Sequence, residues 1–153
     1  MKINDIIIVL IVVAVALIGS WLTSGGMNWY NTLILPSITP PGFFIGAVWT
    51  IIFILSAISA IIFWNKSERN NRLKWVAALF IFNAFLNVFW SLLFFNQHLI
   101  SASIIEMIIL ELTVLALLVL IWPVSKLASA LLTPYAVWVV FATYLAYSIW
   151  LLN

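Results

Sequence analysis

The sequence predicts an all-α fold: an integral membrane bundle of five transmembrane helices, forming one domain over residues 1–153. Of the 153 residues, 67% are hydrophobic and only 7% are charged, which is more apolar surface than a soluble domain can bury. The chain also divides into five apolar stretches of the length that crosses a hydrocarbon core, about 20 residues. Neither an open sheet nor the ~10-residue alternating segments of a membrane barrel fit this pattern.

The first two spans are predicted at residues 6–23 and 43–64. The first apolar run ends at Thr23-Ser24-Gly25-Gly26 without an Ala-x-Ala cleavage pattern, so we expect a retained helix and not a cleaved signal peptide. The connection to the second span holds Pro36, Pro40 and Pro41. Because proline has no backbone N–H, these residues predict a long non-helical loop.

The remaining spans are predicted at residues 75–95, 101–122 and 131–152. The third follows the polar stretch 65–74, and a tight hairpin at Asn96-Gln97-His98 leads into the fourth, which stops at Pro123. Thr133-Pro134 reads as the N-cap and first residue of the fifth helix, although a start nearer Ser129 also fits the sequence.

The basic residues predict the orientation in the cell membrane. With five spans, all six fall on the side of the N-terminus: Lys2, Lys66, Arg69, Arg72, Lys74 and Lys126. The opposite side, formed by residues 24–42, residues 96–100 and the C-terminus, has none. The positive-inside rule therefore predicts a cytoplasmic N-terminus and an extracytoplasmic C-terminus. The same residues are explained as a topology signal facing anionic lipid, so we expect no nucleic-acid partner.

Three of the nine tryptophans do not fit the usual role as interfacial anchors. Six lie at or near the ends of spans, as an aromatic belt requires. Trp49 lies about 9 Å into the second span at 1.5 Å per residue. Trp90 and Trp138 are also inside spans.

A polar and aromatic face is predicted on the third span. Asn83, Asn87 and Trp90 follow the i, i+4, i+7 spacing of one helical face. One interpretation is that the amides only bond to neighbouring helices. The other is a cavity wall, because pockets for flat apolar ligands combine aromatic surfaces with a few polar groups. One helix alone does not decide between them.

Two carboxylates lie inside the fourth span, where ionisable groups are candidates for function. Glu106 and Glu111 are five positions apart, about 140° around the helix, so they are not expected to form one site. Glu106 is close enough to the outer end to reach water or indole N–H groups, and a proton-coupled role is one hypothesis. His98 has no second His or Cys to complete a ligand set, so no metal site is predicted.

Three ordered motifs resemble the translocator protein family, also called tryptophan-rich sensory proteins. The first comprises Trp29-Tyr30, Leu33, Pro36, Pro40-Pro41 and Trp49. The second comprises Asn87, Trp90, Ser91 and Leu93-Phe94-Phe95. The third comprises Leu131-Leu132, Pro134-Tyr135, Trp138, Phe141-Ala142-Thr143, Leu145, Trp150 and Asn153.

This resemblance implies a bundle, expected to be a homodimer, that binds porphyrins and drug-like aromatic ligands in a cavity beneath the first outer loop. No cofactor is required, and a protoporphyrin-like tetrapyrrole is the expected ligand or substrate. With Asn83 added from its helical face, the expected ligand-binding residues are Tyr30, Pro40, Trp49, Phe53, Asn83, Asn87, Trp90, Trp138, Ala142 and Leu145.

One departure from the family bears on the ligand. Animal members carry a proposed sterol motif that ends in a basic residue, and Leu151 stands at that position here, after Leu145 and Tyr147. Cholesterol is therefore not the expected partner, and the resemblance is to bacterial members. Position 146, usually Asn in the family, is Ala, as is position 102. Both changes would enlarge the cavity or alter its ligand preference.

Three functions follow as hypotheses. The first is a porphyrin-binding receptor or sensor. The second is a light- and oxygen-dependent porphyrin-degrading enzyme, in which Trp49 or Trp138 gives an electron to the excited porphyrin. The third is a porphyrin transporter coupled through Glu106, although five spans do not divide into the equal repeats typical of transporters.

Overall fold

The computed structural model describes residues 2–153 and confirms the all-α fold class. Six α-helices and one short π-helix account for the secondary structure over this range, and it contains no strand. Five helical segments are long and apolar enough to cross a membrane: Ile3–Tyr30, Gly42–Lys66, Asn71–Asn96, Ile100–Ile121 and Lys126–Leu152. The predicted domain begins at Met1, which lies outside the described residues.

The first helix differs most from its predicted span. α1 runs from Ile3 to Tyr30, so it continues past the Thr23-Ser24-Gly25-Gly26 stretch that was predicted to end it. Gly26 instead serves a close helix contact, because a Cβ atom there would collide with the backbone of Phe95. The loop that follows is therefore shorter than predicted and covers residues 31–41. It leads into α2, which begins at Gly42 and ends at Lys66.

The third span is a composite of two helix types. α3 covers Asn71–Ser91 and continues as the π-helix η1 over Leu92–Asn96. The side chain of Asn70 accepts a hydrogen bond from the N–H of Leu73 and so caps α3. At the other end, the Asn96 amide donates to the Leu22 carbonyl at 2.9 Å, which joins η1 to α1.

The fifth span is also interrupted. α4 covers Ile100–Ile121, the short α5 covers Lys126–Ala130, and α6 covers Thr133–Leu152. The prediction of Thr133 as N-cap was one residue late, since Leu132 holds that position and Thr133 is already helical. Pro134 accounts for the break before α6, because it has no N–H to bond the carbonyl of Ala130, four residues earlier, and its ring clashes with that carbonyl.

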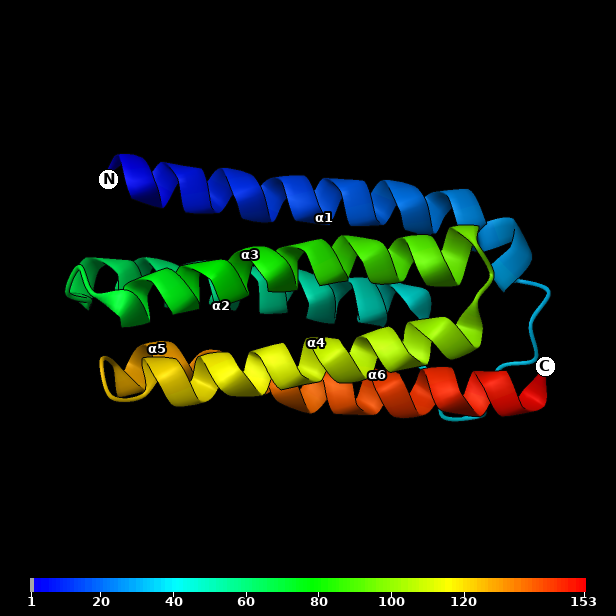
Figure 1. The fold of residues 1–153 in the computed structure, drawn as a ribbon. Helices are drawn as coiled ribbons and strands as arrows, with labels where there is room; N and C mark the ends of the chain where they lie inside the picture. The colour runs from blue at the N-terminus through cyan, green and yellow to red at the C-terminus, as the bar shows by residue number, and fades with distance from the viewer. Residues whose placement is uncertain (1) are drawn as a thin grey trace.

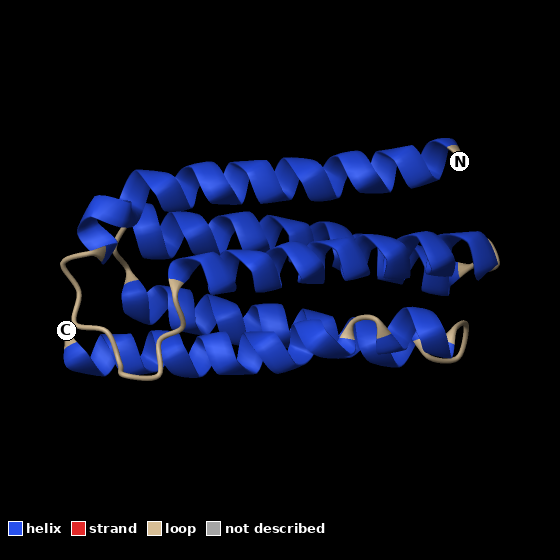
Figure 2. Cartoon of the chain, turned by 180° about the vertical axis from the view of Figure 1, so that it is seen from behind, coloured by secondary structure: helices blue, strands red, loops and turns tan. Residues whose placement is uncertain are grey.

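The helices form an elongated bundle with the two termini at opposite ends (Figure 1). Seen from behind, α1 lies along one side of the bundle, with α4 and α6 on the other (Figure 2). We call the end that carries the N-terminus, the α2–α3 connection and α5 the basic end, because it carries all six Lys and Arg residues. The opposite end, with residues 31–41 and the C-terminus, is the loop end.

Two clusters of buried side chains hold the bundle together. The larger joins α2, α3, η1, α4 and α6 and includes Ile52, Phe94 and Val139. The smaller lies at the basic end and includes Phe63 and Ile121. The apolar window of α1 contributes no buried residue, so this helix is the least embedded of the five. Its exposed apolar side chains suit contact with lipid.

Candidate functional site

A buried polar network lies in the middle of the bundle. The Asn83 amide donates to the Thr113 hydroxyl on α4 at 2.8 Å, and the Asn87 amide donates to the Tyr135 hydroxyl on α6 at 2.6 Å. Tyr135 in turn donates to the Asn83 side-chain oxygen at 2.9 Å. The two asparagines therefore do bond to neighbouring helices, as the first interpretation of this face proposed. Because α3, α4 and α6 all contribute, the network fixes their rotation relative to one another.

The same network forms the floor of an aromatic cluster. The Trp49 ring on α2 meets Tyr135 edge-on, with centroids 6.1 Å apart. Trp49 also lies 5.7 Å from Phe53 one turn later. Trp49 therefore contacts the same Tyr135 to which Asn87 bonds, and Phe53 lines a cavity together with Asn87. These residues form a first aromatic wall.

A second aromatic wall stands between α1 and η1. The Trp90 ring stacks on Phe94 at 5.2 Å and meets Phe95 edge-on at 5.8 Å. Tyr30, the last residue of α1, packs on the same pair at 6.2 and 5.6 Å. Phe94 and Phe95 are consecutive residues of the π-helix, and both side chains are buried. The π-helix thus allows both rings to contact Trp90 and Tyr30.

The third wall belongs to α6. Trp138 packs against Phe44 of α2 at 6.3 Å and Phe141 at 5.3 Å. Ala142 is half-buried against the larger core cluster, and Leu145 is buried within it. Pro40 is half-buried in the loop that precedes α2. Side chains of the protein itself therefore occupy much of the space under the loop.

Several polar atoms in this region have no partner. The indole N–H groups of Trp90 and Trp138 are buried without an acceptor. Both carboxyl oxygens of Glu106 are also buried without a donor. The hypothesis that Glu106 reaches an indole N–H is therefore not met in this structure. Unpaired buried polar groups are rare in folded proteins, and a bound ligand or water is one explanation for them.

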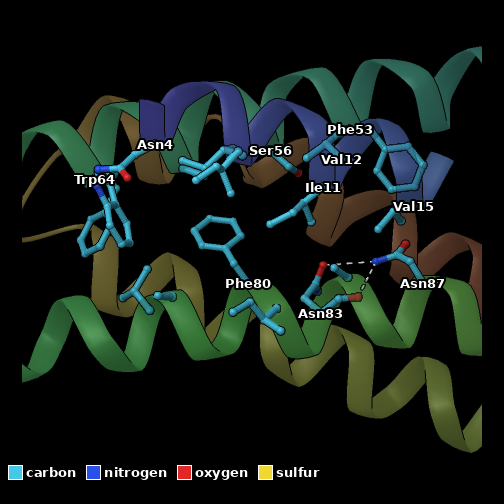
Figure 3. A pocket seen from close by; sticks show the side chains of 18 of the residues that line it. Asn4, Ile11, Val12, Val15, Phe53, Ser56, Trp64, Phe80, Asn83 and Asn87 are labelled. Atoms are coloured by element: carbon cyan, nitrogen blue, oxygen red, sulfur yellow. Dashed lines mark hydrogen bonds between the residues drawn. The ribbon is translucent and has the colours of Figure 1, made fainter. Parts of the chain in front are cut away.

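An open cavity lies next to the polar network, towards the basic end. Its volume is about 300 Å³, and it is bordered by α1, α2 and α3, with Tyr135 of α6 also lining it. Of the predicted site residues, only Phe53, Asn83 and Asn87 line it. Figure 3 shows Asn83 and Asn87 at one end of this space and Asn4 with Trp64 at the other. The other predicted residues do not line this cavity.

Tyr135 appears in the third sequence motif but was not predicted as a site residue. It bridges Asn83 and Asn87 and also supports Trp49. Its sequence carries one usable signal: Tyr135 precedes Trp138 by three residues, which places both on one face of α6. That Tyr135 is the partner of Asn83 and Asn87 could not be predicted, because it depends on which helices face each other.

Comparison with known proteins places this arrangement in a family. Residues 7–151 match the model of the TspO/MBR family. The chain is 36% identical to the tryptophan-rich protein TspO of Archaeoglobus fulgidus over 95% of its length and 94% of that protein. It is 32% identical to the tryptophan-rich protein TspO of Bacillus cereus over 100% of its length and 99% of that protein. Identity to the translocator protein of Homo sapiens is 29%, covering 87% of this chain and 80% of the human protein. The chain therefore belongs to the TspO/MBR family, as a multi-pass membrane protein.

Proposed function

We propose that this protein is a membrane receptor for porphyrins of the protoporphyrin IX type, bound among the aromatic side chains beneath residues 31–41. The observation that carries the proposal is the pair of buried indole N–H groups, on Trp90 and Trp138, that have no acceptor. A porphyrin bears carboxylates that accept such bonds and a flat apolar ring that stacks on indole. Drug-like aromatic ligands with a carbonyl group satisfy the same requirements.

Binding at this site requires a movement of the loop end. Phe44 lies against Trp138, and Phe53 lies against Trp49, so a flat ligand must displace these rings. Phe44 belongs to the first turn of α2, directly after the loop. The loop and the start of α2 are therefore the parts that we expect to open.

The test is a titration of the purified protein with protoporphyrin IX in darkness, followed by absorbance. Trp138→Leu should weaken binding roughly tenfold, because it removes a stacking surface and a donor worth together about 1.4 kcal/mol. Trp122→Leu is the matched control, since Trp122 is 52% exposed at the basic end. The proposed site would be contradicted if both variants weakened porphyrin binding equally, or if neither variant weakened it.

A second candidate is the light-dependent degradation of the bound porphyrin. It is favoured by the position of Trp49 and Trp138, two oxidisable indoles within the proposed site. Trp49→Phe and Trp138→Phe keep an aromatic ring for stacking, so binding should stay within about tenfold of wild type. Protein-dependent bleaching in light should fall much further than occupancy does. Bleaching that simply tracks occupancy would remove the mechanism and leave the receptor function.

A further inference from the structure

The cavity among α1, α2 and α3 adjoins the aromatic site, with which it shares Phe53, Asn83, Asn87 and Tyr135, and extends from these residues towards the basic end. It is lined almost entirely by aliphatic and aromatic side chains, and it lies on the basic-end side of Asn83 and Asn87 (Figure 3). Ile7, Ile11 and Ile81 line it and are 48%, 42% and 64% exposed. Because these exposed residues form its rim, the cavity opens sideways, where the surrounding lipid lies.

The shape of the cavity follows from the way α1 is attached. Near the loop end, Gly26 and the Asn96–Leu22 hydrogen bond hold α1 tightly against η1. At the basic end, α1 is held by Asn65, whose amide donates to Asp5 at 3.0 Å. The α1 residues that line the cavity extend from Asn4, next to the attachment at Asp5, to Val15, before the attachment at Leu22. This stretch is about 16 Å long at 1.5 Å per residue, close to half of the ~30 Å hydrocarbon core.

The basic end of the cavity carries groups suited to an anionic head group. Trp64 lines this end, and its indole N–H is buried without an acceptor. The Arg69 guanidinium lies over the Trp64 ring, 5.0 Å from its centroid. The Lys2 ammonium donates to the side chain of Asn65, next to Trp64, at 2.7 Å. Both cations are exposed and remain available to a phosphate.

We propose that this cavity binds one anionic phospholipid, with an acyl chain between α1, α2 and α3 and the phosphate between Lys2 and Arg69. The acyl chain fits because the lining of the cavity is apolar and because the length of the cavity matches one leaflet of the bilayer. The indole N–H of Trp64 lies at the level where a glycerol ester carbonyl accepts a hydrogen bond, as interfacial tryptophans commonly do. Anionic lipid is favoured over zwitterionic lipid because two exposed cations, Lys2 and Arg69, lie at this end. The one carboxylate beside Lys2 is that of Asp5, whose oxygens already accept from the Lys2 main-chain N–H and the Asn65 amide.

Native mass spectrometry of the purified protein tests the proposal through the lipids that it retains. The protein is mixed with equal amounts of phosphatidylglycerol and phosphatidylcholine of identical chains. We expect one tightly retained lipid, mainly phosphatidylglycerol. Lys2→Gln and Arg69→Gln should each reduce the preference about fivefold. Lys126→Gln is the matched control, because Lys126 lies over the Trp122 ring at 5.7 Å in the same manner but away from the cavity.

The part of the proposal that concerns the acyl chain is tested by filling the cavity with a larger side chain. Ala77 lines it, whereas the neighbouring Ala78 is exposed and does not. Ala77→Phe should abolish lipid retention, and Ala78→Phe should leave it unchanged. Ala60→Phe, from α2, is a second filling variant in case Ala77→Phe fails to fold, which far-UV circular dichroism detects. Retention unaffected by both filling variants, or a head-group preference equal in all the cation variants, would overturn the proposal.

Discussion

At the scale of single residues, the hydroxyl of Tyr135 has two tasks in the polar network. It accepts from Asn87 and donates to Asn83, so its removal takes one hydrogen bond from each amide, although the Asn87 amide still donates to the main-chain and side-chain oxygens of Asn83. Tyr135→Phe should destabilise the protein by about 1 kcal/mol. This value lies between the small net contribution of a hydrogen bond in a membrane bundle and the larger cost of leaving a buried polar group unpaired. Thermal unfolding in detergent measures this effect.

Tyr144→Phe is the control for that variant. Tyr144 lies on the same helix but is 57% exposed, so the loss of its hydroxyl should change stability by less than about 0.5 kcal/mol. If the two substitutions shift the unfolding temperature equally, the network does not stabilise the bundle.

Helical spacing was enough to place Asn83 and Asn87 on one buried face, but it did not supply their partners. The i, i+4 rule describes one helix, whereas Thr113 and Tyr135 come from α4 and α6. Which helices face each other is set by the packing of the whole bundle, and the sequence of α3 holds no record of it. The same reason explains why the unpaired indole groups of Trp90 and Trp138 were not foreseen.

At the scale of helices, the contact between α1 and η1 depends on the absence of a side chain. Gly26→Ala should destabilise the protein by about 1–3 kcal/mol or more, because the new methyl group collides with the rigid backbone of Phe95 and pushes α1 outward. Gly46→Ala, also in a helix, has open space around the new Cβ. It should stabilise the protein by roughly 0.5–1 kcal/mol. Unfolding temperatures in detergent compare the two, and equal effects would rule out the collision.

The loop over the aromatic site is tied to the C-terminal helix. Asn153 accepts a hydrogen bond from the Ile34 N–H at 2.9 Å and donates to the Ile34 carbonyl at 3.0 Å. Asn153→Ala should therefore speed amide hydrogen exchange at Ile34 roughly tenfold or more, since each bond contributes about 1 kcal/mol. Faster porphyrin association should accompany it.

Thr32→Ala provides the comparison within the same loop. Thr32 bonds only to the Trp29 carbonyl nearby, so this variant should leave exchange at Ile34 unchanged. If amide exchange at Ile34 were accelerated to a similar extent in both variants, the opening of the loop would not depend on the hydrogen bonds of Asn153.

Helix boundaries were foreseen less well than helix existence. Gly25-Gly26 is typical of a helix end, yet α1 continues to Tyr30 because Gly26 meets a neighbouring backbone. Tertiary contact thus outweighed local propensity. The π-helix at Leu92–Asn96 likewise has no clear sequence signature, although it orients Phe94 and Phe95 towards Trp90 and Tyr30.

For the whole molecule, hydrophobicity and length alone predicted the fold class, because a bilayer admits few backbone arrangements. The cavity between α1, α2 and α3 was not predicted. Its lining residues are ordinary apolar positions on three helices, and a gap arises only where α1 is held at both ends and not between them. No single-helix pattern encodes such a gap.

Orientation in the membrane is the remaining property of the whole molecule, and it rests on charge. All six basic residues lie at one end of the bundle, and the loop end has none. Retaining this end in the cytoplasm is favourable because translocation of Lys and Arg is opposed. A reporter active only outside the cytoplasm, fused after Asn153, should therefore be active, and the same reporter inserted at Ser67 should be silent. A cytoplasmic reporter at the two positions should give the reverse pattern. Activity of the cytoplasmic reporter at Asn153 would show that the bundle is inverted or that one of the five helices does not cross.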